Sequence, residues 1–582
     1  FAAQGWVEED GTWYYYDKDG NRVEDEWKKS GDNWFWLDSE EGGAMATDKL
    51  VDDDDDTYYV DANGVMVTNT WVKVVNEDQD DDDPAEYRYY YMQSNGKAYK
   101  AGTSSNTTKF KTIDGKKYAF DEDGKMLYGW VNKEDATLAM GDSDWEEATY
   151  YMGSWEDGAL KTGWQKISVY DEDEDDDMDY WFNFKSNGEK RVNTKSDKDI
   201  FEKKLNGKYY GFDERGVMTY EWTAASTNDL TTISNWRYFN SPEDGARSTK
   251  GWFKVVAPDA DGDDNTFKDY GTGSTFAKGD AEDENERWYY ADSDGELYVG
   301  QIKKIKGKYY GFAPEGNKAG SMLTGLCALT VDKDGNIVKL WDRDMDSDSL
   351  DDALKGEGDF KDFGKSSFDT LYYFGNNEDS DGALKTGNVT INLDGDSYQF
   401  QFSKTGGAEG KGRGVNGIDD GKYIYKFGQK IKAGSDDKYI VVYADGDTGS
   451  TGVNVHKIDT ATLRSDYSAS IGQNKDGDSV NYVGTLGELA SGKLTSNYYL
   501  VNTSGAIVKN KTAAKDGNDW YFYVDEKVIK MYTNNNTLND SKDYPNANLT
   551  ALKKNWDNTK YVVNNGKTVP TTPNDDLIDD GI

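Results

Sequence analysis

Short runs of aromatic and β-branched residues recur along the chain, separated by polar segments that contain glycine. The first unit reads Gly5-Trp6, then Trp-Tyr-Tyr-Tyr-Asp at residues 13–17, then a turn that ends at Gly20. Runs of four or five such residues suit a pleated strand, and Asp-x-x-Gly supplies the positive φ that a tight turn needs. Each unit therefore predicts a strand, a loop, an aromatic strand, a glycine turn and a short strand, which together make an all-β fold.

The aromatic run returns mostly every 21 to 32 residues, with one gap of 52 before Trp288, and gives about fifteen diverged repeats. A second motif follows about eight residues after each run. Gly64-Val65-Met66, Gly124-Lys125-Met126 and Gly216-Val217-Met218 are near copies of it. Side chains alternate across a strand, so one face of each aromatic run is predicted to fill the core, and the other to line a groove between successive hairpins.

These motifs, with the related run Gly-Ala-Leu-Lys-Thr-Gly-Trp at 158–164, resemble the cell-wall-binding repeats of Gram-positive surface proteins. That group includes choline-binding modules, glucan-binding domains and the receptor-binding repeats of clostridial toxins. The resemblance implies a β-solenoid of stacked aromatic hairpins. It is strong over residues 1–325, where 15 of the 18 Trp lie, and weaker in later runs such as 371–374 and 520–525.

The change of rhythm after residue 325 predicts the domain organisation. We expect a hairpin solenoid over 1–325, and an irregular linker or insertion over 326–364, in which residues 349–354 suggest a helical turn or two. Diverged repeats are expected over 365–432, a possible small β-domain over 433–490, further repeats over 491–566 and an acidic tail over 567–582.

Composition indicates how such a chain forms a core. There are 18 Trp, 42 Tyr and 21 Phe, although the mean hydropathy is −0.91, so the core is expected to be largely aromatic. The net charge of −43 disfavours nucleic acid and anionic membranes and favours cationic ligands. A single cysteine, Cys327, excludes an internal disulfide framework, and no apolar run approaches the ~18 residues of a membrane span. The start at Phe1 without Met fits a mature, secreted or surface-attached product.

Acidic runs interrupt the loops between paired strands and raise the question of calcium. They occupy residues 52–56, 80–83, 171–177 and 259–264, and equivalent loops of a solenoid would form an acidic ridge. The spacing of an EF-hand is absent, because Ser347 and Ala353 stand where Gly and Glu are required. Loose Ca²⁺ ligation remains open beside the alternative of solvated loops, with Asp171, Asp173, Asp175 and Asp177 as the candidate ligands.

Catalytic chemistry has little support in the sequence. One histidine, His456, leaves no room for a histidine-based triad or zinc site, and we interpret it as an ordinary strand residue. Carboxylate pairs are too numerous to exclude a glycosidase. No segment of catalytic size lies outside the repeats and loops, so we expect that the chain is not an enzyme and requires no cofactor.

The aromatic grooves are the candidate binding sites. Exposed rings can hold a quaternary ammonium by cation–π attraction or stack on the apolar face of a sugar, whereas buried rings are simply core. We expect multivalent attachment to cell-wall or host glycans or choline-like groups; the alternatives are a subunit of an extracellular fibre or surface layer, or an adhesin for a host protein. The candidate ligand-binding residues are Trp13, Tyr15, Trp27, Trp34, Trp36, Tyr58, Trp164, Trp181 and Trp222.

Overall fold

The computed structural model is nearly all-β, as the aromatic pattern predicted, and divides into two compact units. Unit 1 comprises Phe1–Thr249 with Lys268–Lys278, and unit 2 comprises Lys250–Phe267 with Gly279–Ile582. The two-stranded hairpins nevertheless continue into unit 2 as far as Phe312, and the first larger sheet of unit 2 begins at Gly325. The structure describes residues 4–102, 107–134, 137, 139, 141–193, 201–224, 233–239, 243–247, 251–257, 286–315, 318–406, 410–473, 477–483, 486, 488–490, 493–495, 497–525, 528–533 and 569–579.

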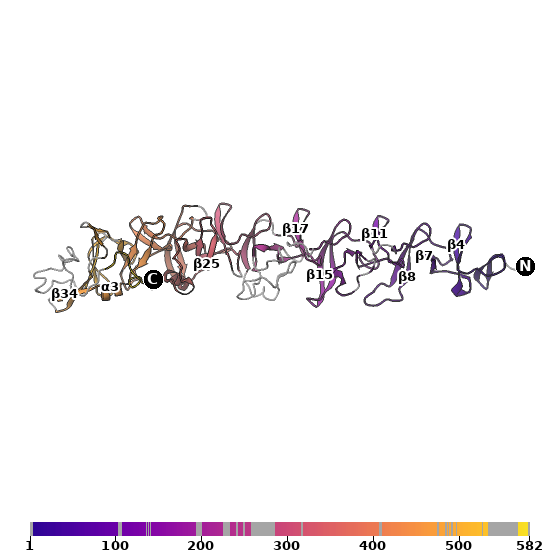
Figure 1. Cartoon of the computed structure of the whole chain (residues 1–582), viewed down its shortest axis with the longest axis horizontal. Coiled ribbons are helices and arrows are strands. Elements are labelled where there is room, and N and C mark those ends of the chain that lie inside the picture. Colours follow the sequence, from indigo (N-terminus) through magenta and orange to yellow (C-terminus); the bar gives the residue numbers. More distant parts are fainter. Residues whose placement is uncertain are drawn as a thin grey trace. The chain divides into compact units, whose positions relative to one another are not determined.

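Antiparallel two-stranded hairpins build unit 1 in chain order, except that a short third strand joins β3–β4. Those labelled in Figure 1 follow one another from β4 to β17. The strands are β1 (Gly5–Glu9), β2 (Thr12–Tyr16), β3 (Glu26–Ser30), β4 (Asn33–Asp38), β5 (Ala44–Met45), β6 (Lys49–Asp53), β7 (Asp56–Val60), β8 (Thr70–Val75), β9 (Tyr87–Met92), β10 (Lys111–Ile113), β11 (Lys116–Tyr118), β12 (Trp130–Val131), β13 (Tyr150–Tyr151), β14 (Gly163–Asp171), β15 (Asp176–Phe184), β16 (Phe201–Leu205), β17 (Lys208–Phe212), β18 (Glu221–Ala224) and β19 (Trp236–Phe239), with 3-10 turns η1 (Ser39–Glu41), η2 (Asp144–Glu146) and η3 (Ile233–Asn235).

Two kinds of turn fix the hairpins. Asp10 and Gly11 join β1 to β2 with φ of 50° and 84°, the left-handed pair that a two-residue hairpin requires. After the aromatic strand, the carboxylate of Asp17 accepts hydrogen bonds from the N–H groups of Asp19 and Asn21. The same Asp turn recurs at Asp61 and Asp121, which explains the Asp-x-x-Gly motif.

Successive hairpins of unit 1 are joined at the residue that follows the glycine turn. The Met66 N–H donates to the carbonyl of Trp34 in the hairpin before it, and the Met126 N–H donates in the same way to Tyr89. A Cβ at Gly96 would collide with the Met66 side chain, so glycine is needed for this close approach. Each hairpin thus packs on the one preceding it.

Larger sheets replace the isolated hairpins through most of unit 2. The strands are β20 (Gly251–Val256), β21 (Glu286–Ala291), β22 (Gln301–Ile305), β23 (Lys308–Phe312), β24 (Gly325–Val331), β25 (Ile337–Asp342), β26 (Asp369–Phe374), β27 (Gly387–Leu393), β28 (Asp396–Phe402), β29 (Gly417–Asp419), β30 (Tyr423–Lys426), β31 (Gln429–Lys430), β32 (Tyr439–Ala444), β33 (Val455–Lys457), β34 (Ala469–Gln473), β35 (Ser479–Val483), β36 (Glu488–Ala490), β37 (Lys493–Thr495), β38 (Tyr498–Asn502), β39 (Ile507–Val508), β40 (Asn510–Lys515), β41 (Tyr521–Asp525) and β42 (Val528–Tyr532), with helices α2 (Ser347–Lys355) and α3 (Thr460–Asp466) and the 3-10 turn η5 (Gly358–Phe360).

The segment 326–364 forms strands and a helix, so it is not an irregular linker; the alternative, an insertion, stays a prediction. β24 lies at the centre of the sheet β25-β24-β26, and Leu326, Ala328 and Leu350 belong to one buried cluster. The helical turn expected at 349–354 is confirmed by α2, which Asp346 caps at its N-terminus through the Ser349 N–H.

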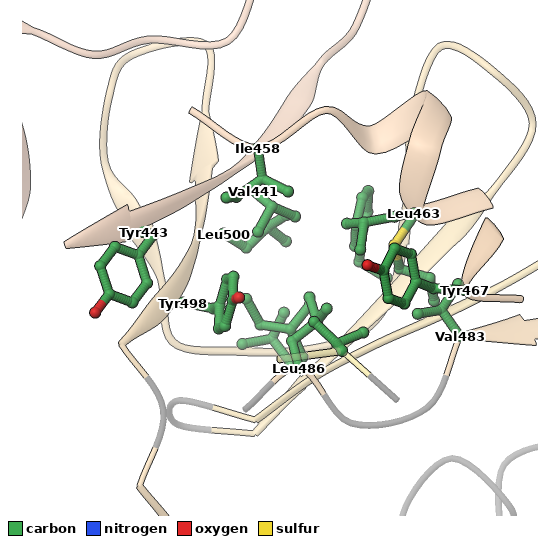
Figure 2. Packing of buried hydrophobic residues seen from close by; sticks show 14 of the residues in the cluster. Val441, Tyr443, Ile458, Leu463, Tyr467, Val483, Leu486, Tyr498 and Leu500 are labelled. Atoms are coloured by element: carbon green, nitrogen blue, oxygen red, sulfur yellow. The ribbon is translucent and has the colours of Figure 1, made fainter. Parts of the chain in front are cut away.

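The segments 433–490 and 491–533 share one core, so a separate small β-domain over 433–490 was also wrong. β32 pairs with β38, and β35 pairs with β42. In Figure 2, Val441, Leu463 and Leu486 converge with Tyr498 and Leu500 on one cluster. The alternation of apolar and polar residues within one strand does not reveal this core, because the strands that form it come from distant parts of the sequence.

The described part of the predicted acidic tail packs into that same core. Val569 and Leu577 are buried in it, and the carbonyl of Pro570 accepts a hydrogen bond from the Tyr498 hydroxyl. The sequence did not predict this packing, because Val569 and Leu577 are only two apolar residues in a polar, acidic segment. Residues 569–579 are therefore part of the unit 2 core.

Candidate functional site

Three rings from two neighbouring hairpins meet at Trp27. Its ring centroid lies 5.2 Å from that of Trp36, its cross-strand partner in the same hairpin, and 5.1 Å from that of Tyr58 in the next. Both contacts are edge-to-face, the geometry that aromatic quadrupoles favour. Trp27 and Tyr58 remain half-buried. We call such a set a ring cage: a central tryptophan, a ring from its own hairpin and a ring from the next.

The same cage recurs along unit 1. Trp71 lies 5.3 Å from Tyr91 and 4.9 Å from Tyr118, and all three rings are half-buried. Trp164 lies 6.3 Å from Trp181 and 4.8 Å from Tyr210.

Two further cages lie at other points of the chain. Trp6 contacts Tyr15 and Phe35 at 5.4 and 5.5 Å. In unit 2, Trp252 contacts Tyr290 and Tyr310 at 5.1 and 4.8 Å.

In three cages, a carboxylate lies near the tyrosine that the next hairpin contributes. Burial, and after it the nearby Asp56, raises the pKa of Tyr58. Burial and then Asp157 do the same for Tyr118, and burial and then Asp244 for Tyr210. The phenols consequently remain neutral at physiological pH, and neutral ring faces attract a desolvated cation. The carboxylates add less to this attraction, because Asp56 is already paired with Lys97 at 3.1 Å and Asp157 with Lys161.

The predicted ligand-binding residues lie in three ring cages, at two exposed positions and at one core position. Trp27, Trp36 and Tyr58 form one cage, Trp164 and Trp181 belong to a second, and Tyr15 belongs to a third. Trp13 and Trp34 are each 40% exposed and form no ring–ring contact in the part of the chain that the structure describes. Trp222 is 1% exposed and packs on Tyr238, so its interpretation as a ligand-contacting ring was wrong: it is core.

Sequence reasoning missed several cage members. They are Trp6, Phe35, Trp71, Tyr91, Tyr118, Tyr210, Trp252, Tyr290 and Tyr310. Strand register was the signal that could have found some of them: a two-residue turn at Asp10-Gly11 places Trp6 opposite Tyr15. The rings contributed by the next hairpin depend on how hairpins stack, which a single repeat does not encode.

The four candidate metal ligands are not assembled into a site. Among the described residues, no group of three or more His, Cys, Asp or Glu side chains is placed to hold a metal ion. Asp171 is buried, accepts a hydrogen bond from the Tyr180 hydroxyl and pairs with Arg215 at 3.0 Å. Asp173, Asp175 and Asp177 lie at the exposed tip of hairpin β14–β15. Calcium binding therefore stays a prediction, and the run at 259–264 lies outside the described residues.

His456 and Cys327 occupy structural positions. His456 lies in β33, as expected, opposite Tyr443, and burial lowers its pKa to about 4, so its imidazole is neutral at physiological pH. Cys327 is a buried free thiol in β24. Within the described residues, the helices are all too short or too polar to cross a membrane.

No family model matches the chain. Among curated proteins, it is 30% identical over 188 residues to glucosyltransferase-S of Streptococcus mutans, a match that covers 31% of this chain. The chain spans only 11% of the length of that relative.

Solved structures that resemble the chain include three from Streptococcus pneumoniae. Choline-binding protein F matches at 18% identity and a TM-score of 0.30, over 58% of this chain and all of that one. The modular autolysin LytC, solved with a synthetic peptidoglycan ligand, matches at 17% identity and a TM-score of 0.28, over 54% and 52%. The choline-binding domain of CbpL matches at 22% identity and a TM-score of 0.22, over 38% and 88%. The repeat motifs of the chain resemble those of choline-binding and glucan-binding cell-wall proteins.

Proposed function

We propose that the chain is a surface-attached or secreted binding protein whose ring cages take up quaternary ammonium groups of a choline-bearing polymer. The observation that carries this proposal is the recurrence of one geometry, a central tryptophan between rings of two successive hairpins, at Trp27, Trp71 and Trp164 and again at Trp252. A quaternary ammonium offers no hydrogen-bond donor, so aromatic faces and a nearby carboxylate are the surroundings that suit it.

The expected affinity of a single cage is low. Cation–π contacts contribute ~1–2 kcal/mol each when desolvated, so three rings give a Kd on the order of millimolar. Several such cages on one chain, engaging one polymer, would raise the apparent affinity by about 10²–10⁴. The proposal has three further parts. The hairpins stack as a solenoid, the chain binds its ligand without catalysing a reaction, and it acts outside the cell.

Glucan is the second candidate ligand class. The similarity to a glucosyltransferase supports it, because rings that hold an ammonium can also stack on the apolar face of a sugar.

Two arms of one experiment separate these ligand classes. Equilibrium dialysis of the folded chain against labelled choline should show saturable sites, and 3,3-dimethylbutan-1-ol, the neutral isostere, should not compete for them. Trp71→Ala should remove one site and Trp13→Ala none, because Trp13 belongs to no cage. Retention on a glucan matrix without choline binding would favour the second class, and absence of both would refute the proposal.

A further inference from the structure

One position in each repeat is occupied by different side chains. It follows the glycine turn and forms a bridge to the last residue of the aromatic strand; its occupants are Arg22, Met66, Ala98, Met126, Lys190, Met218, Arg247, Leu297 and Met322. We call it the turn position. In two repeats a methionine at this position is part of a cage: Met126 clusters with Trp71 and Tyr118, and Met322 clusters with Trp252 and Tyr310.

Lys190 takes the place of methionine with the same backbone and packing. Its N–H donates to the Thr149 carbonyl at 2.8 Å, as the Met126 N–H donates to Tyr89 at 2.8 Å. A Cβ at Gly216 would collide with the aliphatic stem of Lys190, just as one at Gly158 would collide with Met126. Lys190 is only 5% exposed. The stem therefore fills the methionine space, and the ammonium must lie inside the repeat.

The Lys190 ammonium lies in a ring cage of its own. Trp130 is the central tryptophan, 5.0 Å from Tyr151 of its own hairpin and 5.0 Å from Phe182 of the next. Nζ lies 5.1 Å from the Trp130 ring centroid and 6.0 Å from that of Phe182.

Carbonyl oxygens complete the surroundings of this ammonium. Nζ donates hydrogen bonds to the carbonyls of Trp145 and Glu146, at 2.9 and 3.1 Å. Within the described residues Lys190 forms no ion pair. Ring faces and carbonyls contact the ammonium directly, and the carboxylates of Asp213 and Glu146 attract it without forming an ion pair.

This cage is more enclosed than the others. Trp130 is 9% exposed, and Trp145, carried by η2, is 3% exposed and lies 5.9 Å from Phe182. The rings of the Trp71 cage are all half-buried. Burial lowers the pKa of Lys190 to about 7, so the side chain is mostly cationic in mildly acidic solution.

We propose that Lys190 is a built-in cationic occupant of the Trp130 cage, and that the residue at the turn position decides which cages accept a soluble quaternary ammonium. This inference rests on the proposed function. A methionine at the turn position leaves the ring faces of its cage free for a ligand, whereas the ammonium of a lysine already covers them. Two arginines occupy the same position in other repeats: the guanidinium of Arg22 lies 3.7 Å from the Tyr14 ring centroid, and that of Arg247 lies 4.6 Å from the Tyr209 ring centroid.

Removing the occupant tests the proposal. At pH 6, where Lys190 is charged, equilibrium dialysis against labelled choline should find one more site per chain in Lys190→Ala than in the wild type. Choline should also raise the Tm of Lys190→Ala more than that of the wild type, and 3,3-dimethylbutan-1-ol should not. Lys185→Ala, which alters an exposed lysine of the same turn, should behave as wild type. Conversely, Met126→Lys should remove one site.

The outcomes separate this inference from the proposed function. A folded Lys190→Ala chain with the wild-type number of sites, and no choline-specific rise in Tm, would overturn the inference even if the wild type binds choline. If the wild type binds no choline, the proposed function fails for the remaining cages. A choline site that appears only in Lys190→Ala would then still support occupation by Lys190, and its absence would overturn it. Near-UV circular dichroism checks that each variant is folded.

Discussion

The same Tyr-Tyr motif has different surroundings in the two units. In hairpin β6–β7 of unit 1, Tyr58 and Tyr59 are half-buried, because a two-stranded hairpin is covered only by its neighbours. In β38 of unit 2, Tyr498 is 0% and Tyr499 is 9% exposed, because β38 lies between β32 and β39 with a buried cluster on either face. A two-stranded hairpin can therefore leave rings half-exposed, as at Tyr58 and Tyr59, although it also buries others, such as Trp222; in the wider sheet both tyrosines are core.

The two regions also differ in how their cores are assembled. The cages of unit 1 join consecutive hairpins, so loss of one affects its neighbours. The C-terminal core of unit 2 joins residues as distant as Val441 and Leu577, so it is expected to unfold as one piece.

The largest effect is expected in that C-terminal core. Leu500→Ala should lower the free energy of unfolding by about 2–5 kcal/mol, because Leu500 is fully buried and leaves a cavity. Hydrogen exchange should accelerate in all strands from β32 to β42 and remain unchanged in β1 to β9. Acceleration confined to β38 and β39 would contradict a single cooperative core.

Arg215→Ala should lower the free energy of unfolding by a similar or slightly smaller amount, and its effect should stay local. Arg215 pairs with Asp171 and Asp213 at 3.0 Å each, and both carboxylates are buried. Leaving them without a partner costs about 3–5 kcal/mol. Exchange should accelerate in the hairpins β14–β15 and β16–β17, with Lys185→Ala as the neutral control. Equal acceleration in β1 to β9 would show that unit 1 is not organised by nearest neighbours.

Lys190 should make the stability of unit 1 depend on pH. Burial lowers its pKa to about 7, despite attraction from Asp213 and Glu146, and Arg215 lowers it further. Between this value and the unfolded value of ~10.4 the unfolded chain binds the extra proton, so stability rises with pH by up to ~1.4 kcal/mol per unit. Denaturant titrations from pH 7 to 9.5 should show this slope in the wild type and lose it in Lys190→Met. An unchanged slope in that variant would assign the effect to other groups.

Trp13→Ala should have a small effect compared with Trp27→Ala. Trp13 is 40% exposed, and such surface changes usually alter stability by less than about 0.5 kcal/mol. Trp27 holds the contacts to Trp36 and Tyr58, so its loss should destabilise the chain measurably. Equal denaturation midpoints for the two variants would mean that the ring cages add nothing to packing.

The smallest effect is expected from calcium. Asp171 is already paired with Arg215, which leaves only exposed carboxylates of the 171–177 run to attract the ion. Millimolar Ca²⁺ should raise the Tm slightly more than NaCl of matched ionic strength. Identical melting in chelator and in Ca²⁺ would leave the acidic loops as a solubility feature.

The sequence was informative where structure is local. The Asp-x-x-Gly motif predicted the turn after each aromatic strand, because the carboxylate contacts that form this turn lie within a few residues. It was misleading where partners are distant: the 326–364 segment and the tail pack through single apolar residues such as Leu350 and Leu577. Among the cage residues, the sequence singled out Trp27 and Trp36 but not Trp71 and Tyr118, because a cage is formed only when two repeats stack.

The central claim is that the ring cages of this chain bind a quaternary ammonium through its charge. Equilibrium dialysis of the wild type and Trp71→Ala against labelled choline, with 3,3-dimethylbutan-1-ol as competitor, tests it most directly. We expect saturable choline binding with a Kd on the order of millimolar, one site fewer in Trp71→Ala, and no displacement of choline by the neutral isostere. Equal displacement of bound choline by the isostere, or an unchanged number of sites in a folded Trp71→Ala chain, would contradict it.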